Sequence, residues 1–180
     1  FETHMWNIAP TAAAALLAGA VMPRKWALAV PILGTFFSDL IIGFYHVPVM
    51  LTVYGCFAIA ALLGSWIAPR SGSHSESTTG VRKINSLKVL GVSLTSSVVF
   101  FIATNFAVWA SAEWYEKSWQ GLALCYTLAI PFFRNTVLGD LAFTGVMFGA
   151  WVCVNEVLAL RSKQVQILQL INSYVQRIQS

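Results

Sequence analysis

The chain has 180 residues, of which 57% are hydrophobic and only 10% charged, whereas soluble domains carry about 25% charged residues. Its mean hydropathy is +0.69, and no charged residue lies between Lys25 and Asp39, between Asp39 and Arg70, or between Lys88 and Glu113. This composition excludes a nucleic-acid-binding domain, a secreted disulfide scaffold and a disordered tail. It predicts an all-α, polytopic membrane helix bundle whose main partner is the lipid bilayer.

Four apolar segments are expected to cross the membrane in the first two thirds of the chain: Ile8–Met22, Trp26–Tyr45, Val47–Ala68 and Leu87–Ala110. Each approaches the run of about 20 apolar residues that a hydrocarbon layer about 30 Å thick requires. Between the third and fourth, residues 69–86 are rich in serine, threonine and glycine. Such a composition cannot build a core and predicts a flexible linker.

The stretch from Trp119 to Leu160 has two interpretations, because it is too long for one span and contains Pro131 and Arg134. It forms either two full spans, or one partial helix followed by one long span. Basic residues collect in cytoplasmic loops. The three basic clusters share one side of the membrane only if this stretch crosses once: Arg24 and Lys25; Arg70, Arg82, Lys83 and Lys88; and Arg161 and Lys163.

We therefore expect five crossings plus one partial or re-entrant helix. The partial helix covers Trp119–Phe133, and the last crossing covers Asn135–Leu160. Because the chain begins at Phe1 rather than at a methionine, an N-terminal piece is expected upstream. A sixth crossing in that piece would place both termini in the cytoplasm. Residues 1–160 then form the membrane bundle, and the basic clusters place the linker 69–86 and the C-terminus in the cytoplasm.

Residues 161–180 are predicted to form an amphipathic C-terminal helix. Leu168, Ile171, Val175 and Ile178 recur at steps of three and four, the spacing of one apolar helix face. The simpler interpretation is an extension of the last span that lies on the membrane surface. A coiled coil or partner contact is the alternative, for which two heptads are a short basis.

Polar residues inside the spans need an explanation, since an ionisable side chain at the bilayer centre costs about 2.5–3.5 kcal/mol even on the lenient insertion scale. One explanation is an ion pair between Asp39 and Arg134, shared with Asp140, that only locks helices together. The other is an outward-facing polar pocket that binds a small ligand. The predicted topology assigns six polar side chains to the outer half: His4, Asp39, His46, Tyr54, Asn105 and Arg134.

Small residues form two smooth helix faces. The run Ala12–Ala15 continues with Ala18, Gly19 and Ala20, and Gly145 and Gly149 form a Gly-x-x-x-Gly pair. Such faces let helices approach closely, either within the bundle or against a separate membrane partner. The cysteines, Cys56, Cys125 and Cys153, fall inside apolar segments and are expected to be buried. No catalytic or nucleotide-binding motif is present, so we expect no enzyme.

Four motifs carry a family resemblance: Trp6–Thr11, Phe37–Phe44, Thr104–Trp109 and Ala129–Asp140. They resemble an uncharacterised family of small bacterial integral membrane proteins. That family is similar to the substrate-binding (S) components of energy-coupling-factor vitamin transporters, which have six helices and an outward-facing pocket. Its nearest characterised relatives are the solitary cobalamin-uptake proteins. The resemblance implies a multi-pass protein of the bacterial inner membrane.

In that branch a cysteine ligates the cobalt of the corrinoid, beside a histidine, an aspartate, a tyrosine and an arginine. The resemblance implies that His4, Asp39, Tyr54 and Arg134 take the supporting roles, with Asn105 as a further ligand-binding residue of the expected pocket. Cys56 is the cysteine in the corresponding span, and His46 is the alternative metal ligand because imidazole suits such metals.

The expected function is therefore the binding and uptake of a small molecule, with cobalamin as the transported ligand and no other cofactor. A coupling module or a larger complex would dock on the small-residue faces and the C-terminal helix. The alternative from another class is a structural or accessory subunit of a larger membrane complex, which would use the same surfaces for packing alone.

Overall fold

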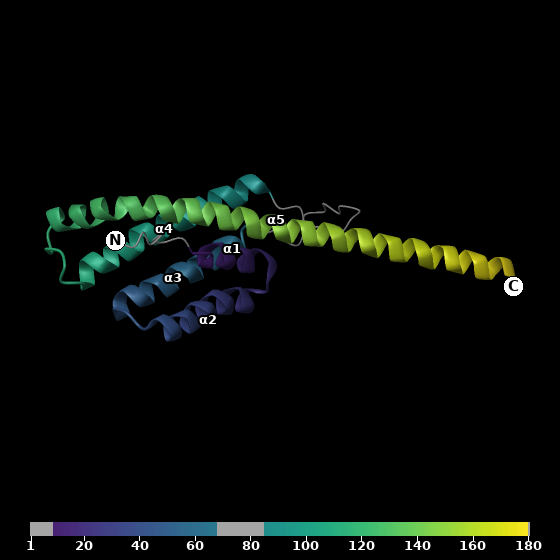
Figure 1. Ribbon diagram of the computed structural model, residues 1–180, viewed down its shortest axis with the longest axis horizontal. Coiled ribbons are helices and arrows are strands. Elements are labelled where there is room, and N and C mark those ends of the chain that lie inside the picture. Colours follow the sequence, from purple (N-terminus) through teal and green to yellow (C-terminus); the bar gives the residue numbers. More distant parts are fainter. Residues whose placement is uncertain (1–8, 68–84, 180) are drawn as a thin grey trace.

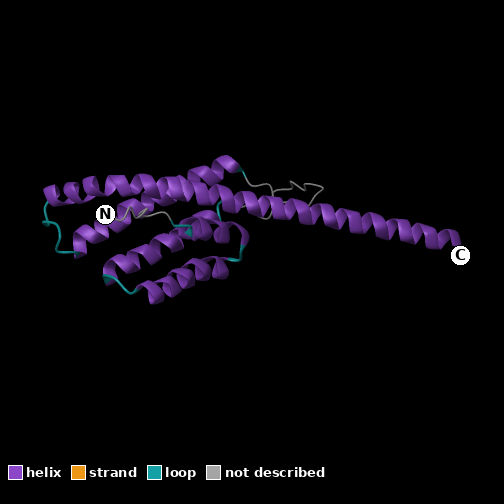
Figure 2. Ribbon diagram, viewed as in Figure 1, coloured by secondary structure: helices purple, strands orange, loops and turns teal. Residues whose placement is uncertain are grey.

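The computed structural model describes residues 9–67 and 85–179, and these ranges contain five α-helices and no strand (Figure 2). The helices are α1 (Thr11–Val21), α2 (Arg24–Ile42), α3 (Val47–Gly64), α4 (Ser86–Ser111) and α5 (Trp119–Gln179). The prediction of an all-α fold is confirmed for this part of the chain. His4 and nearly all of the predicted linker 69–86 lie outside the described residues.

Four of these helices, α2 to α5, are long and apolar enough to cross a membrane, as a multi-pass membrane protein requires. The fifth, α1, has 11 residues and is about 16 Å long, roughly half the hydrocarbon thickness. The predicted first crossing over Ile8–Met22 is therefore represented by a half-length helix. It packs inside the bundle, where it contacts all four other helices. The described residues thus supply four candidate crossings rather than the predicted five.

The second difference from the prediction is α5, which is one continuous helix of 61 residues (Figure 1). The predicted break between Trp119–Phe133 and Asn135–Leu160 is absent, although Pro131 removes one backbone hydrogen bond there. Aromatic contacts hold the helix on both sides of this proline. The ring of Phe101 in α4 lies 5.5 Å from Tyr126 and 4.4 Å from Phe133, measured between centroids. An unbroken helix agrees with a single crossing.

We name the two ends of the bundle by their turns. The Arg24 end carries the turn between α1 and α2, and the His46 end carries the α2–α3 turn and the α4–α5 loop (Figure 1). At the His46 end, Gly43 terminates α2 with a φ of 107°, which only glycine adopts without strain. At the Arg24 end, the Asn85 side chain caps α4 by accepting a hydrogen bond from the Leu87 amide at 2.9 Å.

The hydrophobic core fills the half of the bundle toward the Arg24 end, where α1 packs against α3, α4 and α5. It consists of Ala15, Leu16, Ala20, Ala60, Ala61, Ile67, Val89 and Phe148. Backbones approach very closely here. A Cβ on Gly19 would lie 1.9 Å from the Ala61 carbonyl oxygen, and one on Gly64 would lie 2.1 Å from the Leu16 carbonyl oxygen. The alanine-rich face therefore packs internally, as one of the two interpretations predicted.

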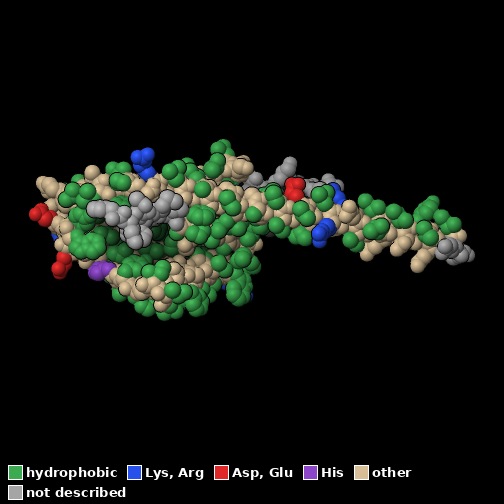
Figure 3. Space-filling view, viewed as in Figure 1, with side chains coloured by type: hydrophobic (Ala, Val, Ile, Leu, Met, Phe, Trp, Pro, Cys, Tyr) green, Lys and Arg blue, Asp and Glu red, His purple; other side chains and the backbone are tan. Residues whose placement is uncertain are grey.

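The outer surface of the bundle is largely apolar, and most of the visible charged side chains lie near the two ends of the bundle (Figure 3). The Gly145–Gly149 pair is part of this surface, since an added Cβ at either glycine meets nothing within 4 Å. Of the cysteines, Cys56 and Cys125 are buried as predicted, whereas Cys153 is exposed. Beyond the bundle, α5 continues along its own axis (Figure 1), and every residue from Leu160 to Ile178 is exposed.

Candidate functional site

The first buried polar group, Asp39, lies on the inner face of α2. Residues Ala27, Pro31, Thr35 and Asp39 are the buried ones in this helix, and their spacing of four places them in one stripe. The Tyr54 hydroxyl of α3 donates a hydrogen bond of 2.7 Å to Asp39 Oδ2. The structure therefore brings two of the predicted site residues together and links α2 to α3 through them.

Arg134 lies elsewhere, because its side chain is exposed on α5. Within the described ranges it forms no ion pair, so the predicted Asp39–Arg134 lock is absent. Hydroxyl groups replace the arginine: Tyr54 satisfies Asp39, and Ser97 of α4 donates to Asp140 Oδ2 at 2.7 Å. A hydroxyl donor satisfies a buried carboxylate without the desolvation of a second charge.

The α4–α5 interface contains a polar seam that we did not predict. In addition to the Ser97–Asp140 bond, the hydroxyls of Ser93 and Thr144 lie 3.2 Å apart, and all four side chains are buried. A sequence signal for the seam was present. Ser93 and Ser97 are four residues apart, as are Asp140 and Thr144, so each pair shares one face of its helix.

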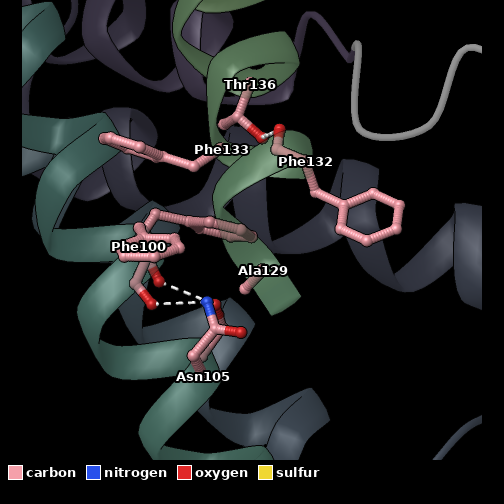
Figure 4. Close-up of a pocket in the computed structure, with 8 residues that line it drawn as sticks. Phe100, Asn105, Ala129, Phe132, Phe133 and Thr136 are labelled. Carbon is pink, nitrogen blue, oxygen red and sulfur yellow. Dashed lines mark hydrogen bonds between the residues drawn. The ribbon is translucent and has the colours of Figure 1, made fainter. Parts of the chain in front are cut away.

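A pocket of 130 Å³, which we call the aromatic pocket, lies between α4 and α5 (Figure 4). It is lined by Phe100, Phe101, Thr104, Asn105, Ala129, Phe132, Phe133 and Thr136. The Asn105 amide nitrogen, a predicted ligand-binding group, donates to the Phe101 carbonyl at 2.8 Å. Its amide oxygen accepts no hydrogen bond from any described residue, so it is a polar acceptor in a hollow whose lining is half phenylalanine.

A second pocket of 90 Å³ adjoins the aromatic pocket, since both are lined by Phe100 and Thr136. Its other lining residues are Ala9, Thr11, Ala12, Phe57 and Asp140. Three of these belong to the start of α1 and the residues just before it. Because α1 begins only at Thr11, it occupies the half of the bundle toward the Arg24 end. This pocket lies next to its first turn, on the side of the His46 end.

A third hollow, which we call the end cavity, has a volume of 550 Å³, is larger than the two pockets above and lies at the His46 end. Its lining combines aromatic, imidazole, hydroxyl and carboxylate groups: Tyr45, His46, Val49, Val108, Ser111, Ala112, Glu113 and Trp114. The ring nitrogen Nδ1 of His46 lies 3.4 Å from the Ser111 hydroxyl. Segments from two hairpins therefore meet here, and each supplies polar and aromatic side chains.

The α4–α5 loop, which forms one wall of the end cavity, is fastened to its flanking helices. The Trp109 indole donates to the Glu116 carbonyl at 2.9 Å. The Lys117 ammonium donates to the carbonyl oxygens of Trp109 and Ala112. Burial, followed by the proximity of Cys125, raises the pKa of Tyr115 in the same loop. The wall is thus held in place by the protein's own contacts.

Tyr45 connects the end cavity to the Asp39–Tyr54 pair. It lies in the α2–α3 turn and lines the cavity. Its pKa is raised by burial and, in second place, by the negative charge of Asp39. The charge of Asp39 therefore disfavours ionisation of a phenol that lines the cavity.

The two predicted metal ligands occupy different environments. His46 lines the end cavity, whereas Cys56 is only 5% exposed within α3 and lines none of the three pockets. Within residues 9–67 and 85–179, no three His, Cys, Asp or Glu side chains are grouped to hold a metal ion. The cavity residues Ser111, Glu113 and Trp114 were missed, because their only sequence signal is a position at the end of a span.

Comparison with known proteins gives one match. No curated protein and no solved structure matches the chain. The model of a family of unknown function, DUF6580, matches residues 1–164. This match covers most of the 180 residues and includes all the pockets described above. The chain therefore belongs to DUF6580, a family of unknown function.

Proposed function

We propose that this protein binds a small molecule in the end cavity and takes it up across the bacterial inner membrane, with a corrinoid such as cobalamin as the first candidate ligand. The observation that carries the proposal is the end cavity itself. Its 550 Å³ fall within the range of about 300–1,000 Å³ of small-molecule sites. A corrinoid is larger than this volume, so only part of the ligand would enter the cavity. Its lining also has the usual composition of such sites, apolar and aromatic surface with a few polar groups.

The polar and aromatic lining groups each have a chemical role toward such a ligand. The imidazole of His46 is a suitable donor for cobalt, and the contact between its Nδ1 and Ser111 leaves Nε2 as the metal-binding nitrogen. The rings of Tyr45 and Trp114 offer flat surfaces to a macrocycle, and Glu113 accepts hydrogen bonds from its amide side chains. Of the two candidate metal ligands, Cys56 from the family resemblance and His46 from the chemistry of its imidazole, we therefore favour His46.

Asp39 and Tyr54 lie next to the end cavity, toward the middle of the bundle, and do not line it. Their hydrogen bond ties α2 to α3 just beneath the turn that carries Tyr45 and His46. We propose that loss of this bond loosens the turn and weakens binding without a direct contact to the ligand. Asn105 lines the deeper aromatic pocket instead, where it would act only on a ligand that has moved past the cavity.

Absorption spectroscopy of hydroxocobalamin tests the proposal with the full chain in lipid nanodiscs. We expect saturable binding and a shift of the corrinoid bands, both lost in His46→Ala. The matched variant Cys56→Ser should retain both. A wild-type protein that binds no hydroxocobalamin would overturn the corrinoid assignment. Binding that survives His46→Ala but fails in Cys56→Ser would reverse the choice of cobalt ligand.

The proposed orientation has the His46 end outside and the Arg24 end in the cytoplasm. It rests on the basic residues near the Arg24 end, among them Arg24, Lys25 and Lys88, since such residues favour the cytoplasmic side. In a variant without native cysteines, an impermeant maleimide added to intact cells should label Glu113→Cys but not Ser162→Cys. The opposite labelling pattern would invert the topology.

One observation favours a second candidate function, that of an accessory subunit in a larger membrane complex. Along α5, an added Cβ at Gly145 or Gly149 would meet nothing within 4 Å, and the residues from Leu160 to Ile178 are exposed. The two functions make different predictions for the hydroxocobalamin binding experiment described above. An accessory subunit binds no corrinoid, and its end cavity tolerates His46→Ala without any effect on cell growth or uptake.

A further inference from the structure

One face of α5 stays uncovered from the membrane part of the helix to its C-terminal end. Within the bundle this face consists of small or medium-sized residues that are all exposed: Ala142, Val146, Gly149, Ala150 and Cys153. An added Cβ on Gly149 would meet nothing within 4 Å. At 100° per residue, Val157 and Leu160 continue the same face, so it passes without interruption from the bundle into the extension.

In the extension, this face follows a seven-residue repeat. The first and fourth positions of each repeat (a and d) are Val157, Leu160, Gln164, Ile167, Ile171, Tyr174 and Ile178. The six apolar members are each more than half exposed. The opposite side of the helix carries Ser162, Gln166, Gln169, Ser173 and Gln176. Apolar a and d positions opposite a polar side are the signature of a coiled-coil helix.

The charges at the start of the extension indicate what the partner is. In this register Glu156 occupies position g and Arg161 the next position e. Two residues five apart on one helix do not face each other, but g and the following e of two parallel helices do. Glu156 is the only acidic residue after Asp140. A second copy of the chain therefore supplies the complementary charge to each of the two residues.

We propose that the exposed face of α5 binds the same face of a second copy of this chain. The extensions form a parallel coiled coil, and the small side chains at Gly149 and Cys153 allow close helix contact where α5 leaves the bundle. Insertion of both copies with the same orientation makes the pairing parallel. Gln164, the one polar residue among the a and d positions, fixes the register. Self-association through α5 does not depend on what the end cavity binds.

A second copy explains the geometry better than a lipid surface does. An interfacial helix lies in the plane of the membrane, whereas the extension leaves the bundle along the axis of a helix that is continuous from Trp119 to Gln179 (Figure 1). To reach the lipid headgroups, α5 would have to break, and no glycine or proline follows Gly149 to assist such a break.

Disulfide cross-linking in membrane vesicles provides the direct test. The full chain carries Cys153→Ala, which removes the native thiol on this face, together with either Ile171→Cys or the matched control Gln169→Cys on the opposite side. We expect oxidation to yield covalent dimers at least about tenfold more readily at position 171 than at position 169. Equal yields, no dimer at either position, or a label at position 171 that is immersed in lipid would overturn the proposal.

Charge reversal tests the register independently of any introduced thiol. Glu156→Arg and Arg161→Glu should each weaken self-association of the otherwise wild-type chain in nanodiscs or detergent by about fivefold, the range expected for two exposed ion pairs. The double variant restores complementary charges and should return to within about twofold of the wild type. A double variant as weak as the single ones, or single variants without effect, would contradict the parallel pairing.

Discussion

Two pairs of helical glycines have opposite environments. Gly19 and Gly64 lie at the α1–α3 contact, where an added Cβ would enter the backbone of the facing helix. Gly145 and Gly149 are equally small and equally helical, yet an added Cβ meets nothing within 4 Å. The comparison shows that a small-residue pattern indicates the capacity for close contact but not whether the partner lies in the same chain.

The largest expected effect is that of Gly19→Leu. The side chain would have to displace α3, because its Cβ alone would lie 1.9 Å from the Ala61 carbonyl oxygen. We expect a loss of about 3 kcal/mol of stability or of the folded protein altogether. Gly145→Leu is the matched control and should retain the wild-type melting temperature in detergent. Equal losses in both variants would remove the distinction between the two glycine pairs.

A smaller loss of stability is expected from a change in the polar seam, which lies between α4 and the covered face of α5. Ser97→Ala removes the hydroxyl that donates to the buried carboxyl group of Asp140. An unsatisfied buried acceptor costs about 2 kcal/mol, so the melting temperature should fall. Thr95→Ala, at an exposed position of the same helix whose hydroxyl bonds only within α4, should change it little. A fall as large in Thr95→Ala would contradict a specific role of the seam.

Gly43 provides a third kind of glycine, constrained by its backbone rather than by its neighbours. An added Cβ there meets nothing within 4 Å, but its φ is 107°. Gly43→Ala should therefore destabilise the α2–α3 turn by about 1 kcal/mol, visible as a modest fall in melting temperature. If the end cavity depends on this turn, hydroxocobalamin affinity should fall as well. Unchanged stability would show that the turn relaxes freely.

The smallest expected effect has the opposite sign. Gly145→Ala adds a side chain where space is open, and alanine is the better helix former by about 0.5–1 kcal/mol. The melting temperature should rise slightly in dilute detergent, where α5 extensions are separated. A clear decrease would mean that Gly145 already contacts a partner under these conditions.

The overall class of the fold follows from the sequence, but two elements do not. Length and hydropathy indicate apolar helices, and the positions of α2, α3 and α4 agree with the predicted spans within a few residues. The length of α1 depends on its place between the other helices. The continuity of α5 through Pro131 depends on aromatic contacts from Phe101. Tertiary packing determines the length of α1 and the continuity of α5, and it cannot be read from hydropathy or from local helix propensity.

For the candidate site, the sequence predicts at which level along its helix a polar side chain lies. It does not predict toward which neighbour that side chain points around the helix axis. Asp39 and Tyr54 were assigned to one level of the membrane, and they do form a hydrogen bond. Arg134 was assigned to a similar level, yet it is exposed. Only the neighbours of a helix determine which of its faces turns inward. The loop residues of the end cavity follow no helical period, so the sequence offered no pattern for them.

The 61 residues of α5 make it a lever. Helix geometry gives it a length of about 90 Å, of which about 45 Å extend past the packed part of the bundle. A tilt of about 10° around the point where α5 leaves the bundle would therefore displace its C-terminal tip by about 8 Å. The start of α5, at the α4–α5 loop that walls the end cavity, lies about 45 Å on the other side of that point, so the same tilt would move the cavity wall and the tip by similar distances in opposite directions.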